Sequence, residues 1–216
     1  NSASNGTKYS AYGLAAARAS RMLRRNGIGY TTRLYFLREL DGMQFAIDGE
    51  GDLVRLMELA LRAGRAILDV YATDFAVDRK ADASPVTEAD HRAEAVILAG
   101  LRQIVPEIPI IAEEEVAAGR IPLPSDPFFL VDPLDGTKEF LARNGEFTVN
   151  IALIKGGIPV MGVVHAPALG TVYGGGPGGA FKATAVDQAL GALQPIRVRS
   201  APAAVIAIGS RSHGSD

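Results

Sequence analysis

The chain has 216 residues, a formal net charge of −2 and no cysteine. It can form one large domain or two small ones, contains no disulfide or thiolate metal site, and has no general electrostatic attraction to nucleic acid. Hydrophobic residues make up 48% of it, enough for a sizeable core, and no apolar run is long enough to span a membrane.

The first fifty residues differ in charge from the rest. Seven basic residues and no acidic one precede Glu39, whereas residues 51–216 contain fifteen basic and twenty acidic residues. We predict that residues 1–50 are a basic leader, either disordered or foreign to the native protein, and that residues 51–216 form the N-terminal and central part of a folded domain. Because an Arg-rich, Ser-containing start is also typical of a transit peptide, organelle import through residues 1–40 is an alternative.

A long amphipathic helix is predicted at the start of this domain. It begins at about Asp52, a suitable N-cap residue, and ends at about Tyr71. Apolar residues keep helical spacing from Leu53 to Leu68, which predicts one buried face.

A second helix is predicted over residues 88–105, after a strand over 75–79. It should stop before Pro106, which cannot continue a helix. Thr87 and Asp90 have the spacing of a capping box at its start. A cap is therefore a purely structural alternative to any chemical role of Asp90.

Carboxylates follow two predicted core strands, over residues 108–112 and 128–131. Glu113 is the first of three consecutive glutamates after the first strand, and Asp132 and Asp135 follow the second. Hard oxygen ligands of this kind suit Mg²⁺. Taken alone, the glutamate run is equally typical of a solvated charged surface.

The segment Asp132-Pro-Leu-Asp-Gly-Thr137 suggests a site for a cation and a phosphate. Pro133 has no N–H and should turn the chain at the strand end, which leaves the Leu134 carbonyl able to face a cation. Gly136 lets a ligand approach the backbone, and Thr137 begins a predicted helix whose first N–H groups attract phosphate. Taken alone, these turn-forming residues are also typical of a surface loop.

The rest of the chain is predicted to be mainly strands. Glycines over residues 174–179 are interpreted as a hairpin turn, because the ending of a phosphate-binding loop is missing. The histidines lack metal-ligand spacing, with His91 expected on a helix surface and His165 at a strand end. Two helices before a run of strands predict helices packed on an antiparallel or mixed sheet. The strands are expected over 147–154 and 160–165, joined at 155–159, near Val172 and Phe181, and over 196–198 and 205–208.

The motif over residues 132–137 resembles the signature of the inositol monophosphatase superfamily, which are Mg²⁺-dependent, lithium-sensitive phosphatases. The longer run over 132–153, with Lys138-Glu-Phe and Arg143-Asn-Gly-Glu-Phe, more narrowly resembles the CysQ-type 3′(2′),5′-bisphosphate nucleotidases, as do residues 80–90 and 210–213. The resemblance extends from about Gly51 to the last residue. It implies a layered α/β (α+β) sandwich.

The resemblance also implies an activity and a site. The activity is Mg²⁺-dependent hydrolysis of 3′-phosphoadenosine 5′-phosphate to AMP and phosphate, a step of sulfur metabolism and nucleotide recycling. Two or more Mg²⁺ ions would be held by Glu113, Asp132, Asp135 and the carbonyl of Leu134. The implied catalytic residues are Asp90, Thr137 and Glu113. The implied substrate contacts are Glu113, Leu134, Asp135, Gly136, Thr137, Lys138 and Arg143.

Other readings of the chain remain open. The activity could be that of an inositol monophosphatase, or the chain could be an inactive phosphate or nucleotide binder. The superfamily has a further aspartate in a Trp-Asp-x-Ala segment, and this chain has no tryptophan. We therefore expect a domain that is incomplete at its C-terminus, with little or no phosphatase activity as written.

The expected partner is a small phosphorylated nucleotide rather than a nucleic acid, and a homodimer is compatible with the sequence. We expect a cytoplasmic location, with peripheral attachment at the inner membrane face as an alternative.

Overall fold

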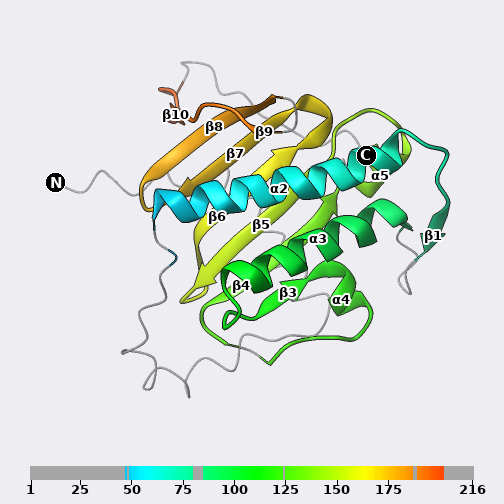
Figure 1. The fold of residues 1–216 in the computed structure, drawn as a ribbon, viewed down its shortest axis with the longest axis horizontal. Coiled ribbons are helices and arrows are strands. Elements are labelled where there is room, and N and C mark those ends of the chain that lie inside the picture. The colour runs from blue at the N-terminus through cyan, green and yellow to red at the C-terminus, as the bar shows by residue number, and fades with distance from the viewer. Residues whose placement is uncertain (1–46, 48, 80–84, 124, 187–188, 202–216) are drawn as a thin grey trace.

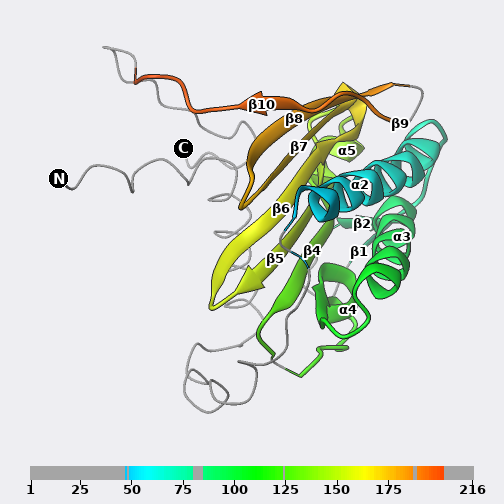
Figure 2. The same ribbon diagram turned by 60° about the vertical axis from the view of Figure 1, so that its left-hand side comes forward.

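The structure is a computed structural model, and it describes residues 47, 49–79, 85–123, 125–186 and 189–201. Two long helices, α2 (Glu50–Tyr71) and α3 (Glu88–Ile104), lie side by side across one face of a large sheet (Figure 1), and Figure 2 shows both on the same side of it. This mixed α/β arrangement confirms the prediction of helices packed on a mixed sheet. The strand predicted over 205–208, the motif at 210–213 and most of the predicted leader lie outside the described residues.

Helix α2 spans Glu50–Tyr71 and begins two residues before the predicted start. The amide of Leu53 already donates to the carbonyl of Gly49 at 3.2 Å, so Gly49 is the N-cap and the prediction of Asp52 as N-cap is wrong. Asp52 lies in the first turn instead, where a carboxylate is also favourable, and its Oδ1 is 3.6 Å from Arg55. The predicted apolar face is buried except at Leu68, which is 36% exposed.

Glycines allow α2 to approach its neighbours closely. A Cβ at Gly64 would lie 2.4 Å from the ring of His165 in the sheet, and a Cβ at Gly100 would lie 2.3 Å from Leu59 on α2. His165 is 3% exposed, and burial lowers its pKa although its Nδ1 lies 3.1 Å from the carbonyl of Thr171. The histidine near the end of its strand is therefore part of the core that faces α2.

Helix α3 spans Glu88–Ile104 and confirms the second predicted helix. It follows β2 (Pro85–Thr87), which pairs antiparallel with β1 (Val77–Arg79). His91 lies on its exposed surface, as expected. Within the described ranges, no helix is both long and apolar enough to cross a membrane.

The main sheet runs in the order β10-β8-β7-β6-β5-β4-β3 in the described residues, with β9 paired to β8. The β3–β4 pair is parallel and the other pairs are antiparallel. Gly176 pairs with Gly179, which confirms a hairpin turn in the glycine-rich segment. The strands are β3 Ile110–Ala112, β4 Phe128–Asp135, β5 Thr148–Lys155, β6 Ile158–Ala166, β7 Thr171–Gly176, β8 Gly179–Val186, β9 Ala189–Leu190 and β10 Gln194–Ile196. The short helices are α4 Glu113–Ala117, α5 Thr137–Leu141 and a 3₁₀ turn, Pro167–Leu169.

Candidate functional site

The parallel pair β3–β4 brings two of the predicted ligands to one edge of the sheet. Ala112 is in register with Val131, so the next residues along the two strands are Glu113 and Asp132. Both are half-buried. Ligand sites of α/β proteins commonly lie at the carboxyl ends of parallel strands. Residues 19 positions apart in the sequence are therefore neighbours at a place that suits ligand binding.

Strand β4 differs from the prediction at Pro133. The chain was expected to turn there, but β4 continues to Asp135, and the pairing with β5 shifts register between Asp132 and Asp135. A bulge accommodates a proline that cannot donate a ladder hydrogen bond, and bulges redirect side chains near sites. The side chain of Leu134 is only 2% exposed, so it anchors the bulge in the core. The segment is therefore not a surface loop.

Helix α5 begins at Thr137, as predicted, immediately after the bulged strand. Gly136 is its N-cap and has φ 99°, a conformation that favours glycine. A Cβ at this position would be 3.0 Å from the carbonyl oxygen of Glu146. Glycine is therefore needed to bring the start of α5 back against the chain that leads into β5.

Asp90 links the start of α3 to the start of α5. Its Oδ2 accepts hydrogen bonds from the amide and the hydroxyl of Thr87, at 2.8 and 2.7 Å, which confirms the capping box. Its Oδ1 lies 3.4 Å from the hydroxyl of Thr137, which is itself 3.5 Å from the carbonyl oxygen of Leu134. Asp90 therefore caps α3 with one oxygen and reaches the predicted site with the other.

Two residues of β5 were not predicted as part of the site. Asn150 pairs with Asp132 in the strand register, and its Nδ2 lies 3.3 Å from Oδ2 of Asp135. Thr148 pairs with Asp135, and its hydroxyl lies 3.4 Å from Oδ1 of Asn150. The period-two alternation of a strand could have placed both on the carboxylate-bearing face, once the β4–β5 register was known.

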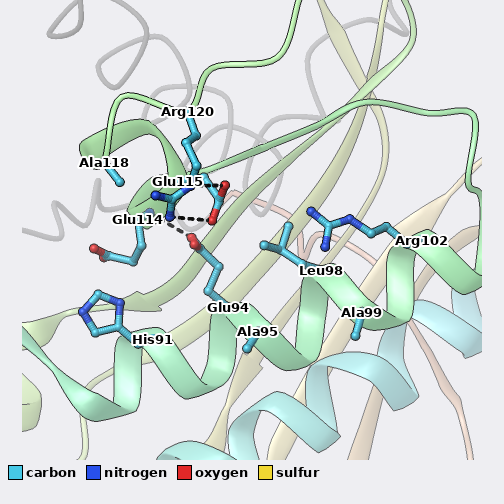
Figure 3. Close-up of a pocket in the computed structure, with 10 residues that line it drawn as sticks. All are labelled: His91, Glu94, Ala95, Leu98, Ala99, Arg102, Glu114, Glu115, Ala118 and Arg120. Carbon is cyan, nitrogen blue, oxygen red and sulfur yellow. Dashed lines mark hydrogen bonds and ion pairs between the residues drawn. The ribbon is translucent and has the colours of Figure 1, made fainter.

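Glu94 is a third residue that the prediction missed. It is 4% exposed on the inner side of α3, and its Oε2 accepts a hydrogen bond of 2.8 Å from the amide of Glu114 in α4 (Figure 3). Burial raises the pKa of Glu94 to about 7, against the opposing effect of the Glu114 amide and with the help of the Glu114 and Glu115 charges. A glutamate at a buried position of the helical pattern, four residues after Asp90, was the available signal.

The glutamate run is not a solvated surface, because it forms the first turn of α4 and Glu114 is only 6% exposed. Glu115 pairs with Arg120 at 2.7 and 2.8 Å, which lowers the pKa of Glu115. Figure 3 shows these residues facing α3 across a cavity of about 350 Å³. The cavity is lined by His91, Glu94, Ala95, Leu98, Ala99, Arg102, Glu114, Glu115, Ala118 and Arg120.

The two predicted substrate cations after Thr137 have different environments. Lys138 is exposed, and no hydrogen bond or ion pair joins its side chain to any residue of the described ranges. Arg143 donates instead to backbone carbonyls, those of Tyr71 and of Thr73, the latter at 2.6 Å. Lys138 is therefore available to a ligand, whereas the Arg143 guanidinium is engaged by the end of α2.

The predicted metal ligands offer the donor chemistry of a Mg²⁺ site. In the part of the chain that the structure describes, no three His, Cys, Asp or Glu residues form a cluster that could hold an ion alone. Mg²⁺ seldom needs such a cage, because it keeps waters and is usually bound by one or two carboxylates together with substrate phosphates. Glu113, Asp132 and Asp135 supply hard oxygens, beside a helix start that suits a phosphate, so these residues fit the ion.

Comparison with known proteins identifies the family. The model of the inositol monophosphatase family matches residues 51–215. The chain belongs to this family. The bulged β4 segment and the α5 start therefore lie inside the matched region, as do α3 and α4.

Curated members of the family show the same relationship in sequence. The chain is 48% identical over 166 residues to the 3′(2′),5′-bisphosphate nucleotidase CysQ of Salmonella typhimurium, an alignment that covers 76% of this chain and 65% of that protein. It is 45% identical over 163 residues to the CysQ of Escherichia coli K12, covering 74% and 64%. The chain thus spans slightly less than two thirds of the length of these relatives.

Solved structures of the family confirm the fold. CysQ from Bacteroides thetaiotaomicron, a bacterial member of the inositol monophosphatase family, superposes with a TM-score of 0.59 at 35% identity, over 76% of this chain and 64% of that one. The extragenic suppressor protein suhB of Bartonella henselae has a TM-score of 0.52 at 31% identity, over 59% and 50%. The described helices and sheet are therefore a part of the inositol monophosphatase fold.

Proposed function

We propose that this protein is a Mg²⁺-dependent phosphomonoesterase that hydrolyses 3′-phosphoadenosine 5′-phosphate to AMP and phosphate. The observation that carries the proposal is the contact between Asp90 and Thr137, which are 47 positions apart, beside the carboxylates at the ends of β3 and β4. The names of the relatives with 45–48% identity support the nucleotide substrate.

In the proposed reaction a water oxygen attacks the 3′-phosphorus while the bond from phosphorus to the ribose oxygen breaks. Asp90 and Thr137 orient that water, with Glu113 beside them. The amides at Gly136 and Thr137 bind phosphate oxygens. Glu113, Asp132, Asp135 and the Leu134 carbonyl would hold Mg²⁺, which when bound lowers the pKa of the water and stabilises the leaving oxygen. The ribose oxygen takes up a proton and leaves as the 3′-hydroxyl of AMP.

Phosphate release with Mg²⁺ and with EDTA tests the metal requirement, measured on the longest natural chain that contains these residues. We expect turnover to require Mg²⁺, because without the ion the carboxylates would repel the substrate phosphate. Asp132→Asn and Asp135→Asn should abolish turnover, because each removes a proposed ligand of the ion. Asp69→Asn on the exposed surface of α2 is the matched control and should keep full activity. Undiminished turnover in EDTA would contradict the proposal.

The substrate is tested by the ratio of kcat/KM for 3′-phosphoadenosine 5′-phosphate and for inositol 1-phosphate. We expect the nucleotide to be preferred, because exposed Lys138 can contact the second phosphate. A charge-assisted contact is worth roughly 1.5–3 kcal/mol, which corresponds to tenfold or more in the ratio. Lys138→Thr should reduce the ratio accordingly. Equal kcat/KM values for the two substrates in the unmodified protein would favour an inositol monophosphatase instead.

A further inference from the structure

The proposed phosphate-binding turn, Gly136 and Thr137, and the short helix α5 that follows it contact the ends of two other helices. On one side, Thr137 lies against Asp90 at the start of α3. On the other side, the residues after α5 contact the end of α2 through Arg143. The first attachment belongs to the proposed catalytic residues, whereas the second lies outside them and involves a residue that was expected to contact substrate.

Arg143 completes the end of α2. The last carbonyls of a helix lack intrahelical partners. In α2 the carbonyl of Leu68 accepts from the amide of Ala72, and that of Val70 accepts from the amide and hydroxyl of Thr73. The carbonyl of Tyr71 accepts from the Arg143 guanidinium. Since α2 has no basic residue in its last turn, Arg143 also supplies the positive charge that the C-terminal end of a helix favours.

The guanidinium of Arg143 also lies over two aromatic rings. Its central carbon lies 5.1 Å from the ring centroid of Tyr71 and 4.7 Å from that of Phe75. Phe140 of α5 packs on both rings, with centroids 5.0 and 4.7 Å away, and on Phe147, 5.2 Å away. The planar fork of arginine can bridge two carbonyls and stack on rings at once, which a lysine cannot do.

The backbone of Arg143 forms the left-handed turn directly after α5. Among the described non-glycine residues it alone has a positive φ, of 57°. Such a conformation is uncommon for a residue with a Cβ, and it persists where surrounding contacts determine it. Here the end of α5 determines it, because the amides of Arg143 and Asn144 donate to the carbonyls of Phe140 and Glu139 in the left-handed turn that ends the helix, and the side-chain contacts of Arg143 act in addition.

We propose that Arg143 is a positioning residue that holds α5, and with it the phosphate-binding turn at Gly136 and Thr137, against the end of α2, and that it does not contact substrate. The effect on turnover rests on the proposed phosphatase function, whereas the attachment itself does not. The proposal replaces the expectation that Arg143 binds a substrate phosphate, and leaves that role to Lys138.

Hydrogen–deuterium exchange tests the attachment without any activity. The reporters are the amides of Phe140 and Ala142, which are bonded within α5 to Gly136 and Lys138. We expect Arg143→Lys and Arg143→Gly to speed their exchange by about tenfold or more, while amides of β6 and β7 are unchanged. Arg143→Gly removes any backbone strain, so faster exchange in it isolates the lost contacts. Lys138→Ala is the matched control and should leave exchange in α5 unchanged.

Kinetics then separate positioning from substrate contact. In the Arg143 variants we expect kcat to fall for 3′-phosphoadenosine 5′-phosphate and for a simple monophosphate by the same factor, with partial rescue of Arg143→Gly by added guanidinium ion. Unchanged exchange in α5, or a loss confined to the bisphosphate, would overturn the proposal. Faster exchange in a protein without phosphatase activity would retain the attachment and reject the proposed function alone.

Discussion

Helices α3 and α4 start in similar surroundings but satisfy their first amides in different ways. Each follows a short strand directly, and each has acidic residues in its first turn. Helix α3 is capped locally, by the hydroxyl and amide of Thr87 with Asp90. Helix α4 has Ala112 at its N-cap, with no side-chain acceptor, and the amide of Glu114 bonds instead to Glu94, twenty residues earlier.

The difference shows what is required for a remote cap, that is, a helix start capped by a side chain distant in the sequence. A local capping box forms from neighbours in sequence, so it needs no other element. The cap of α4 exists only because α3 packs beside it and buries the Glu94 carboxyl, which raises the pKa of that group to about 7. Since Glu113 is the first residue of α4, the position of a proposed metal ligand depends on this remote contact.

The largest effect is expected from Asp90→Asn, which tests whether Asp90 acts in the reaction as well as capping α3. We expect activity to fall by about a hundredfold or more, since misplacing a reacting group such as the water that Asp90 orients can cost about 10²-fold. Thr87→Ala is the matched control, because it weakens the same cap but keeps the carboxylate. It should cost about 1 kcal/mol in the free energy of unfolding and retain most of the activity. Equal losses of activity in the two variants would reduce Asp90 to a structural role.

The second prediction concerns the remote cap and pH. The pKa of Glu94 is raised in the folded protein, from 4.5 to about 7, so its contribution to stability is fully present below 4.5 and is lost as the pH rises through about 7. Glu94→Gln keeps an acceptor for the Glu114 amide and cannot ionise. Between about pH 5 and pH 8, the free energy of unfolding of this variant, measured with denaturant, should therefore rise relative to that of the unmodified protein by on the order of 2 kcal/mol.

Glu58→Gln, at an exposed position of α2, is the control for this experiment and should follow the pH profile of the unmodified protein. A Glu94→Gln profile parallel to that of the unmodified protein would show that Glu94 titrates normally and that its burial has no consequence for the start of α4.

The smallest effect is expected at Glu88, which shares the first turn of α3 with Asp90 but faces solvent. Its carboxylate lies 2.6 Å from Arg92, and both side chains are more than half exposed. Glu88→Gln should change the free energy of unfolding by about 0.5 kcal/mol or less, because exposed ion pairs contribute little. Thermal unfolding of the variant beside Thr87→Ala measures this, and a larger loss in Glu88→Gln would mean that charge rather than capping secures this helix start.

Local patterns gave reliable predictions where neighbours in sequence decide the outcome. The capping box at Thr87, the start of α5 at Thr137 and the hairpin at Gly176 and Gly179 are all confirmed. The prediction of Asp52 as N-cap was wrong. A negative charge is favourable anywhere in the first turn of a helix, so it does not mark the first residue, and the backbone bond from Leu53 to Gly49 sets where α2 begins.

Non-local contacts could not be predicted in the same way. The bulge at Pro133 depends on the pairing of β4 with β5, and the arrangement of Asn150 against Asp135 depends on the same register. Arg143 and Lys138 looked alike in the sequence, as two cations after one turn. Only the folded chain brings the end of α2 to Arg143 and leaves Lys138 exposed.

The sequence by itself determined helices α2, α3 and α5, most strands, the family resemblance and most of the candidate site residues, because these follow from periodicity, capping and a contiguous motif. The tertiary structure decided which of those residues meet. Asp90 reaches Thr137, Glu94 reaches Glu114, and Arg143 reaches α2 across separations of 47, 20 and about 70 positions. Contacts over such distances are set by how helices pack on a sheet, and no local pattern encodes that packing.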